Sequence, residues 1–146
     1  MDHNPAAMPI QFTTTHRVQF SETDLAGVVH FSNFFRWMEE VEHAYFRSVG
    51  SSVAMLSDEA HIGWPRVSAT CDFLAPVRFE DEVQLVLRIV KLGEKSLNYE
   101  VEFLSGGKRV ALGKTTSVCC QITPQGMKSI PIPPTLRQRL ETGSAQ

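Results

Sequence analysis

The chain has 146 residues, of which 42% are hydrophobic and 21% charged, and its formal net charge is -2. This balance is typical of one globular domain, and it argues against a nucleic-acid-binding protein, which would carry a basic surplus. The polar start shows no signal peptide, and no apolar run reaches the roughly 20 residues of a membrane helix. Three cysteines, two of them adjacent, make a poor disulfide framework. We therefore expect a cytoplasmic protein with reduced thiols that binds neither nucleic acid nor membrane.

The sequence predicts one domain with loose ends. We expect a flexible N-terminal segment at 1–15, a single domain at 16–135 and a C-terminal tail at 136–146 that holds a short polar helix. The domain begins with a short β-leaning segment, His16 to Phe20, and a turn-rich stretch follows it.

One long helix is predicted from Asn33 to Val49. Its apolar positions recur at steps of three and four, and neighbouring apolar residues widen the stripe, so most of the helix girth should be enclosed. Ser32 or Asn33 is the expected N-cap, and Gly50 is the expected C-terminal stop. The central stripe consists of Phe34, Met38, Val41, Tyr45 and Val49.

Beyond the helix the apolar pattern changes to period two, which predicts strands. The last candidate strand carries small residues on one face, which would let a helix approach the sheet closely. A helix followed by four strands with short turns indicates an α+β fold with an antiparallel sheet against one helix. Such a sheet leaves a face or edge open, so we expect a homodimer or homotetramer. The candidate strands lie at 67–73, 83–89, 97–103 and 110–122.

Asp24 is the candidate for chemistry. It lies in a loop that leads into the start of the long helix, where unpaired N–H groups and partial positive charge suit a developing oxyanion. A carboxylate beside them can act as nucleophile or general base, and a thioester suits so sparse a site because a thiolate leaves readily. Spacing alone leaves open that Asp24 is only a turn or capping residue. No motif for a metal or cofactor is present, so none is expected.

A family resemblance strengthens the catalytic hypothesis. The run ETDLAGVVHFSNF at residues 22–34 resembles the signature of the 4-hydroxybenzoyl-CoA thioesterase family, and the resemblance continues through FRWME at residues 35–39. Weaker matches lie at 76–81, at 95–97 and at Pro131, so the resemblance covers roughly 17 to 131.

The resemblance implies a hotdog fold, in which a curved antiparallel sheet wraps one long helix and active sites lie at dimer interfaces. It places the catalytic aspartate at Asp24 and the backbone N–H that polarises the substrate carbonyl at Phe31. Gly27 would permit the tight loop between them. The substrate would be an acyl-CoA, with an aromatic or a short acyl group.

The resemblance also suggests an acyl pocket formed by His30, Phe34 and Trp64. His30 stands where the family has an aromatic residue, and a packing role is its alternative. Trp64 precedes a strand, and the alternative to a pocket role is that it lies in a surface loop. Glu39 on the helix is a second candidate base, because another branch of hotdog thioesterases uses a helix glutamate, but a structural or partner-facing role is favoured.

Lys95 and Ser96 are the expected contacts for the CoA phosphates, because they match the family's Lys-Ser position. Lys91 and Lys108 are weaker candidates. The function that follows is an acyl-CoA thioesterase. The alternative is a non-catalytic hotdog protein that binds acyl-CoA or acyl-carrier protein, while a hotdog dehydratase would need a histidine motif that the sequence lacks.

Overall fold

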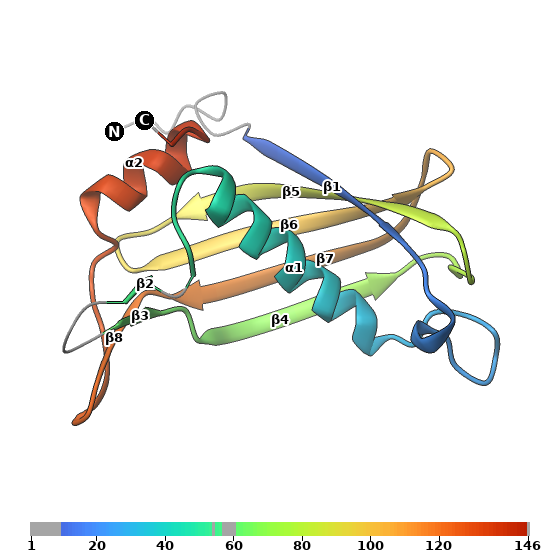
Figure 1. The fold of residues 1–146 in the computed structure, drawn as a ribbon, viewed down its shortest axis with the longest axis horizontal. Helices are drawn as coiled ribbons and strands as arrows, with labels where there is room; N and C mark the ends of the chain where they lie inside the picture. Colours follow the sequence, from blue (N-terminus) through green and yellow to red (C-terminus); the bar gives the residue numbers. More distant parts are fainter. Residues whose placement is uncertain (1–9, 54, 57–60, 146) are drawn as a thin grey trace.

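The computed structural model describes residues 10–53, 55–56 and 61–145, which form two antiparallel sheets and two α-helices (Figure 1). In the larger sheet, the strands in spatial order are β1 (Gln11–Arg17), β5 (Glu82–Leu92), β6 (Ser96–Ser105), β7 (Lys108–Val118) and β4 (Arg66–Phe73). The smaller sheet contains β2 (Met55–Leu56), β3 (His61–Gly63), β8 (Cys120–Thr123) and β9 (Gly126–Ser129). The helices are η2 (Phe20–Glu22, a 3-10 turn), α1 (Ser32–Ser48) and α2 (Pro134–Thr142).

Helix α1 lies across one face of the larger sheet, as the sequence predicts (Figure 1). Its apolar stripe is buried, and Gly50 follows the helix with a φ of +77° that favours glycine. The predicted N-cap is wrong: Phe31 occupies that position, and its own side chain makes no capping hydrogen bond. The α+β architecture with one enclosed long helix is confirmed. The buried residues of α1 are Phe34, Trp37, Met38, Val41, Glu42, Tyr45 and Phe46.

The small residues of β7 let α1 approach the sheet closely. Met38 lies directly over Gly113, where an added Cβ would come within 2.7 Å of the Met38 Cε atom. Ala111, Thr115 and Ser117 on the same face are also buried. The helix therefore sits lower on the sheet than larger side chains would allow.

Two strand predictions need correction. The first strand runs from Gln11 to Arg17 and pairs with β5 along its whole length, so residues 11–15 are part of the sheet and not of a flexible segment. Residues 1–9 of that segment lie outside the described part of the chain. The predicted strand at 110–122 is broken at Cys119, whose N–H donates to the Lys95 carbonyl at 2.7 Å, and the chain then enters the smaller sheet as β8.

The C-terminal tail predicted at 136–146 is also wrong over most of its length. Helix α2 packs on the core through Leu136 and Leu140, which lie one turn apart and are buried. The Tyr45 hydroxyl on α1 donates to the Leu140 carbonyl at 2.8 Å. The last helix therefore belongs to the folded domain.

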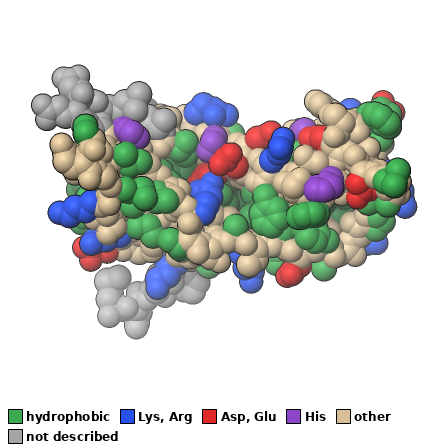
Figure 2. Space-filling model, turned by 90° about the horizontal axis from the view of Figure 1, so that it is seen from below, with side chains coloured by type: hydrophobic (Ala, Val, Ile, Leu, Met, Phe, Trp, Pro, Cys, Tyr) green, Lys and Arg blue, Asp and Glu red, His purple; other side chains and the backbone are tan. Residues whose placement is uncertain are grey.

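Strand β4 is an edge of the larger sheet, and among the described strands it pairs with β7 alone. Its side chains are mostly exposed, including Val67 at 63% and Phe73 at 48% of their surface. In Figure 1, β4 is the lowest strand of the larger sheet. The view of the molecule from below shows apolar side chains exposed between charged ones (Figure 2). An unpaired apolar edge of this kind favours association with another chain.

We predict that Gly113→Val lowers the free energy of unfolding by about 1–3 kcal/mol, because its branched side chain must displace Met38 and lift α1. Chemical denaturation at fixed protein concentration measures the change. Lys114→Ala is the control, since Lys114 is the next residue of β7 and is exposed. Equal stability of the two variants would contradict the close seating of the helix.

Candidate functional site

The loop from Thr23 to Phe31 joins η2 to α1 and is tightly closed. Thr23 and Val29 form an antiparallel bridge, and the Asp24 N–H donates to the Val28 carbonyl at 2.8 Å. Within the bridge, the Gly27 N–H donates to the Asp24 carbonyl at 2.9 Å, and Gly27 has a φ of +79°. Glycine adopts this left-handed conformation without strain, as the sequence prediction for Gly27 requires.

The Asp24 side chain is half-buried and turned back onto its own loop. Its Oδ1 accepts hydrogen bonds from the N–H groups of Ala26 at 2.8 Å and Val28 at 3.4 Å. Its Oδ2 accepts no hydrogen bond from any residue that the structure describes. Asp24 is therefore a turn residue, and it also keeps one carboxylate oxygen available for a substrate or a water molecule.

The start of α1 provides a free donor close by in the chain. The N–H of Asn33 donates to the His30 carbonyl at 3.0 Å, and the N–H of Ser32 reaches His30 Nδ1 at 3.3 Å. The N–H of Phe31 donates to no residue in the described part of the chain. An unpaired N–H at the positive end of a 17-residue helix is suited to polarise a carbonyl.

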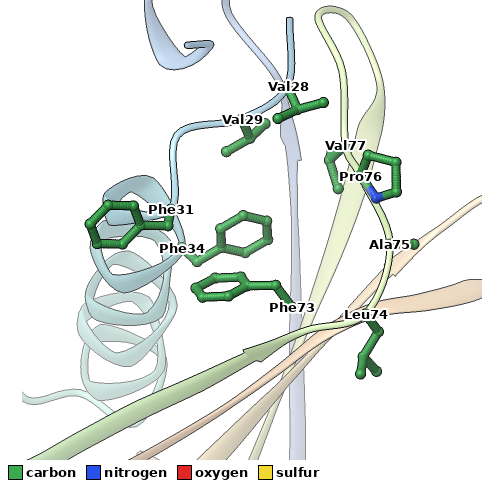
Figure 3. A pocket seen from close by; sticks show the side chains of 9 residues that line it. All are labelled: Val28, Val29, Phe31, Phe34, Phe73, Leu74, Ala75, Pro76 and Val77. Carbon is green, nitrogen blue, oxygen red and sulfur yellow. The ribbon is translucent and has the colours of Figure 1, made fainter. Parts of the chain in front are cut away.

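A cavity of about 300 Å³ opens beside this helix start (Figure 3). The rings of Phe34 and Phe73 project toward each other in it, with their centroids 5.1 Å apart in an edge-to-face arrangement. All the side chains of its wall are apolar, so it fits an uncharged, hydrophobic group. Its lining residues are Val28, Val29, Phe31, Phe34, Phe73, Leu74, Ala75, Pro76 and Val77.

Of the three side chains predicted for the acyl pocket, only Phe34 lines this cavity. His30 is exposed, stacks on Phe31 with centroids 4.6 Å apart, and has its Nδ1 2.8 Å from the Ser32 hydroxyl. Trp64 is buried against Phe46, with centroids 5.6 Å apart, and borders a different cavity beside the middle of α1. The structure does not bring Trp64 together with Asp24.

Glu39 lies away from the Asp24 loop. Its side chain is 60% exposed, and its carboxylate is 3.9 Å from the Arg66 guanidinium. Arg66 also binds Glu42, which is buried on α1 and accepts a hydrogen bond from Arg66 Nη1 at 3.1 Å. Burial raises the pKa of Glu42, and the Arg66 guanidinium opposes this shift. The sequence interpretation overlooked this pair, although a glutamate inside an apolar stripe is a signal for a buried partner.

Lys95 and Ser96 lie at the far end of the sheet from Asp24. β1 ends at Arg17 opposite Glu82, the first residue of β5, whereas Lys95 lies in the turn after β5. With 11 residues at about 3.3 Å each, β5 separates the two ends by roughly 35 Å (Figure 1). Lys95 is exposed and Ser96 half-buried. One chain alone therefore does not place these residues beside Asp24.

Glu22 is a second residue that the sequence interpretation did not single out. Its side chain is only 16% exposed and lies beside His16 and Trp37, two residues before Asp24 in the chain. No local spacing rule links these positions, because they come from β1, η2 and α1.

Comparison with known proteins identifies the family. Residues 18–140 match the family described as the thioesterase-like superfamily. The chain belongs to this superfamily. The 1,4-dihydroxy-2-naphthoyl-CoA hydrolase of Nostoc punctiforme is 30% identical over 125 residues, which cover 84% of this chain and 82% of the relative.

Solved structures agree with this assignment. A gentisyl-coenzyme A thioesterase superimposes with a TM-score of 0.78 at 33% identity, over 88% of this chain and 99% of the other. A 1,4-dihydroxy-2-naphthoyl-CoA thioesterase from Synechocystis gives a TM-score of 0.76 at 25% identity, over 90% and 96% of the two chains. The predicted hotdog fold and the predicted class of enzyme, an acyl-CoA thioester hydrolase, are confirmed.

Other kinds of site are absent from the part of the chain that the structure describes. No helix in the described part of this thioesterase-like chain is long and apolar enough to cross a membrane. Among the residues that the structure describes, no three potential metal ligands cluster together. The roles of Asp24, Phe31, Gly27 and Lys95 stay predictions.

We predict that Asp24→Asn folds normally and loses activity by about 100-fold or more. The amide oxygen of asparagine can still accept the Ala26 and Val28 hydrogen bonds, but the negative oxygen is gone. Thermal unfolding and steady-state hydrolysis of an acyl-CoA measure the two effects. Asp81→Asn is the matched control, because Asp81 also accepts a hydrogen bond from its own turn, from the Arg78 N–H at 2.9 Å. Retention of most activity by Asp24→Asn would refute the assignment and direct attention to Glu39.

Proposed function

We propose that this protein hydrolyses CoA thioesters of hydroxylated aromatic acids, with Asp24 as the catalytic carboxylate. One observation carries the proposal: a carboxylate with a free oxygen, a free helix-start N–H at Phe31 and an apolar cavity with aromatic walls occur around one loop. The carboxylate and the N–H supply the two groups that acyl transfer needs, and the cavity supplies room for the acyl group.

The chemistry follows from these groups. The thioester carbonyl accepts a hydrogen bond from the Phe31 N–H, which stabilises the negative charge that develops on its oxygen. Asp24 either attacks the carbonyl carbon, giving an acyl-aspartate that water then hydrolyses, or takes a proton from a water molecule that attacks. In both routes the C–S bond breaks, CoA leaves as the thiolate, and the products are the free acid and CoA.

An aromatic acyl group fits the cavity better than a flexible chain. The edge-to-face pair of Phe34 and Phe73 presents ring surfaces on which another ring packs favourably. The relatives with identities of 25% or more that are named above act on dihydroxynaphthoyl-CoA or gentisyl-CoA. Both observations support a hydroxylated aromatic acid as the acyl group.

A second copy of the chain completes the proposed site. Antiparallel pairing of two β4 edges turns the partner by half a rotation, so that its β5–β6 turn comes to the end of the assembly that carries the Asp24 loop. The exposed Val67 and Phe73 would be covered in such a dimer. The Lys95 of one subunit could then contact the CoA phosphates of a substrate held at the Asp24 of the other.

A non-catalytic acyl-CoA-binding protein is the competing function. The same cavity would serve it, but binding alone gives no reason for a carboxylate oxygen left free beside a free helix N–H.

The cytoplasmic location expected from the sequence remains a prediction, and the three cysteines are free thiols, as that location requires.

A substrate panel tests the proposed function. We expect kcat/KM to be higher for 4-hydroxybenzoyl-, gentisyl- and 1,4-dihydroxy-2-naphthoyl-CoA than for acetyl-, hexanoyl- and palmitoyl-CoA. Phe73→Ala should lower kcat/KM for the aromatic esters more than for acetyl-CoA, because Phe73 contributes ring surface to the cavity. Binding without hydrolysis of every ester would favour the competing function, and a preference for straight chains would refute the aromatic assignment.

A mixing experiment tests the shared site. Lys95→Ala should raise KM for CoA esters several-fold with little change in kcat, and a truncated thioester without the nucleotide should be indifferent to it. When Asp24→Asn and Lys95→Ala chains are unfolded and refolded together, each mixed dimer has one intact site. At low substrate concentration the mixture should exceed the sum of the two proteins refolded separately. No gain would place both residues in one chain's site, and sedimentation as a 16.3 kDa monomer would refute the dimer.

A further inference from the structure

The Glu22 carboxylate is almost saturated with hydrogen-bond donors. Oε1 accepts from the Gln19 N–H at 2.7 Å and lies 2.8 Å from His16 Nε2, while Oε2 accepts from the Trp37 indole N–H at 3.0 Å. An ionised carboxylate only accepts, so the proton of His16 must be on Nε2. Partial burial alone would raise the pKa of Glu22, but the hydrogen bonds from Gln19, His16 and Trp37 lower it overall.

The backbone of Glu22 makes a second set of connections. Its carbonyl accepts hydrogen bonds from the His30 N–H and from the Asn33 side-chain amide, both at 2.8 Å. The next residue, Thr23, forms the bridge to Val29. Glu22, at the end of η2, thus contacts β1 through His16, the far end of the Asp24 loop through His30, and the first turn of α1 through Asn33.

Asp24 itself has no comparable anchor. Among the residues that the structure describes, its carboxylate contacts only N–H groups of its own loop, and Leu25 to Gly27 at the loop tip are exposed. The position of Asp24 relative to the Phe31 N–H is therefore determined by the contacts at the base of the loop. That base is held by the Thr23–Val29 bridge, by the Val29 N–H on the Val77 carbonyl at 2.8 Å, and by Glu22.

We propose that Glu22 is a positioning residue for catalysis, which holds the Asp24 loop in register with the start of α1. The inference rests on the proposed function of Asp24. Glu22 makes its contacts with its carboxylate turned into the protein, toward His16 and Trp37, so it orients the reacting groups without contacting the substrate. Because catalysis depends steeply on the placement of the reacting groups, loosening this base should reduce kcat and leave substrate binding largely intact.

Glu22→Gln tests this role. The amide group of glutamine would oppose donors that now point at a carboxylate oxygen, so the loop base should loosen while the size of the side chain is kept. We expect kcat for an aromatic CoA ester to fall by about 10–100-fold with KM within about twofold of the wild-type value. Glu82→Gln is the matched control, since Glu82 is an exposed carboxylate paired with Arg17, and it should keep wild-type kcat and KM.

Asn33→Ala provides a milder second test. It removes the hydrogen bond from the Asn33 amide to the Glu22 carbonyl and leaves the carboxylate network intact, so kcat should fall several-fold at unchanged KM. If Glu22→Gln does not fold, Asn33→Ala decides the matter alone. Wild-type kcat in Asn33→Ala, or a rise in KM at constant kcat in either variant, would overturn the positioning role. If the wild-type protein hydrolyses no CoA ester, the proposed function fails instead, and the two failures are distinguishable.

Discussion

The seating of α1 on the sheet is the constraint on which the rest of the structure depends. Met38 fits over Gly113 because β7 presents small residues there, and this contact sets the height of the helix above the strands. The height fixes where Phe31 and the first turn of α1 lie relative to the strand ends. Trp37, one turn after Asn33, then meets His16 of β1 and Glu22, with the His16 and Trp37 rings 4.7 Å apart. The packing of the core thereby sets the geometry of the loop that carries Asp24.

The features that the sequence predicted correctly are local ones. The apolar period revealed α1 to within one residue at each end, and the run at residues 22–34 identified the loop and its Gly27. The features that it missed join distant segments. Glu22 with His16 and Trp37, Arg66 with Glu42, and α2 with Tyr45 are contacts that no spacing rule encodes. The end of β7 was misplaced for the same reason, because the Lys95 carbonyl that accepts the Cys119 N–H belongs to the turn between β5 and β6.

The separation of Asp24 from Lys95 gives the proposed dimer a functional meaning. Asp24 lies at one end of the sheet, and the turn with Lys95 lies at the other, braced by the Arg137 guanidinium of α2, which donates to the Leu92 carbonyl at 3.4 Å. A half-rotation about an axis at the β4 edge places the Asp24 end of one subunit beside the Lys95 end of the other. In this account a single exposed strand edge serves both stability and substrate binding, because the same association covers apolar surface and brings the two halves of each site together.

The most direct measurement is a crystal structure of the Asp24→Asn protein with an uncleaved hydroxybenzoyl-CoA. The account predicts that the thioester carbonyl accepts a hydrogen bond from the Phe31 N–H, that the ring lies between Phe34 and Phe73, and that the phosphates reach the Lys95 turn of the second subunit. A thioester bound away from the Phe31 N–H, for example in the cavity beside Glu39 and Glu42 with no part of the acyl group near residue 24, would contradict the account.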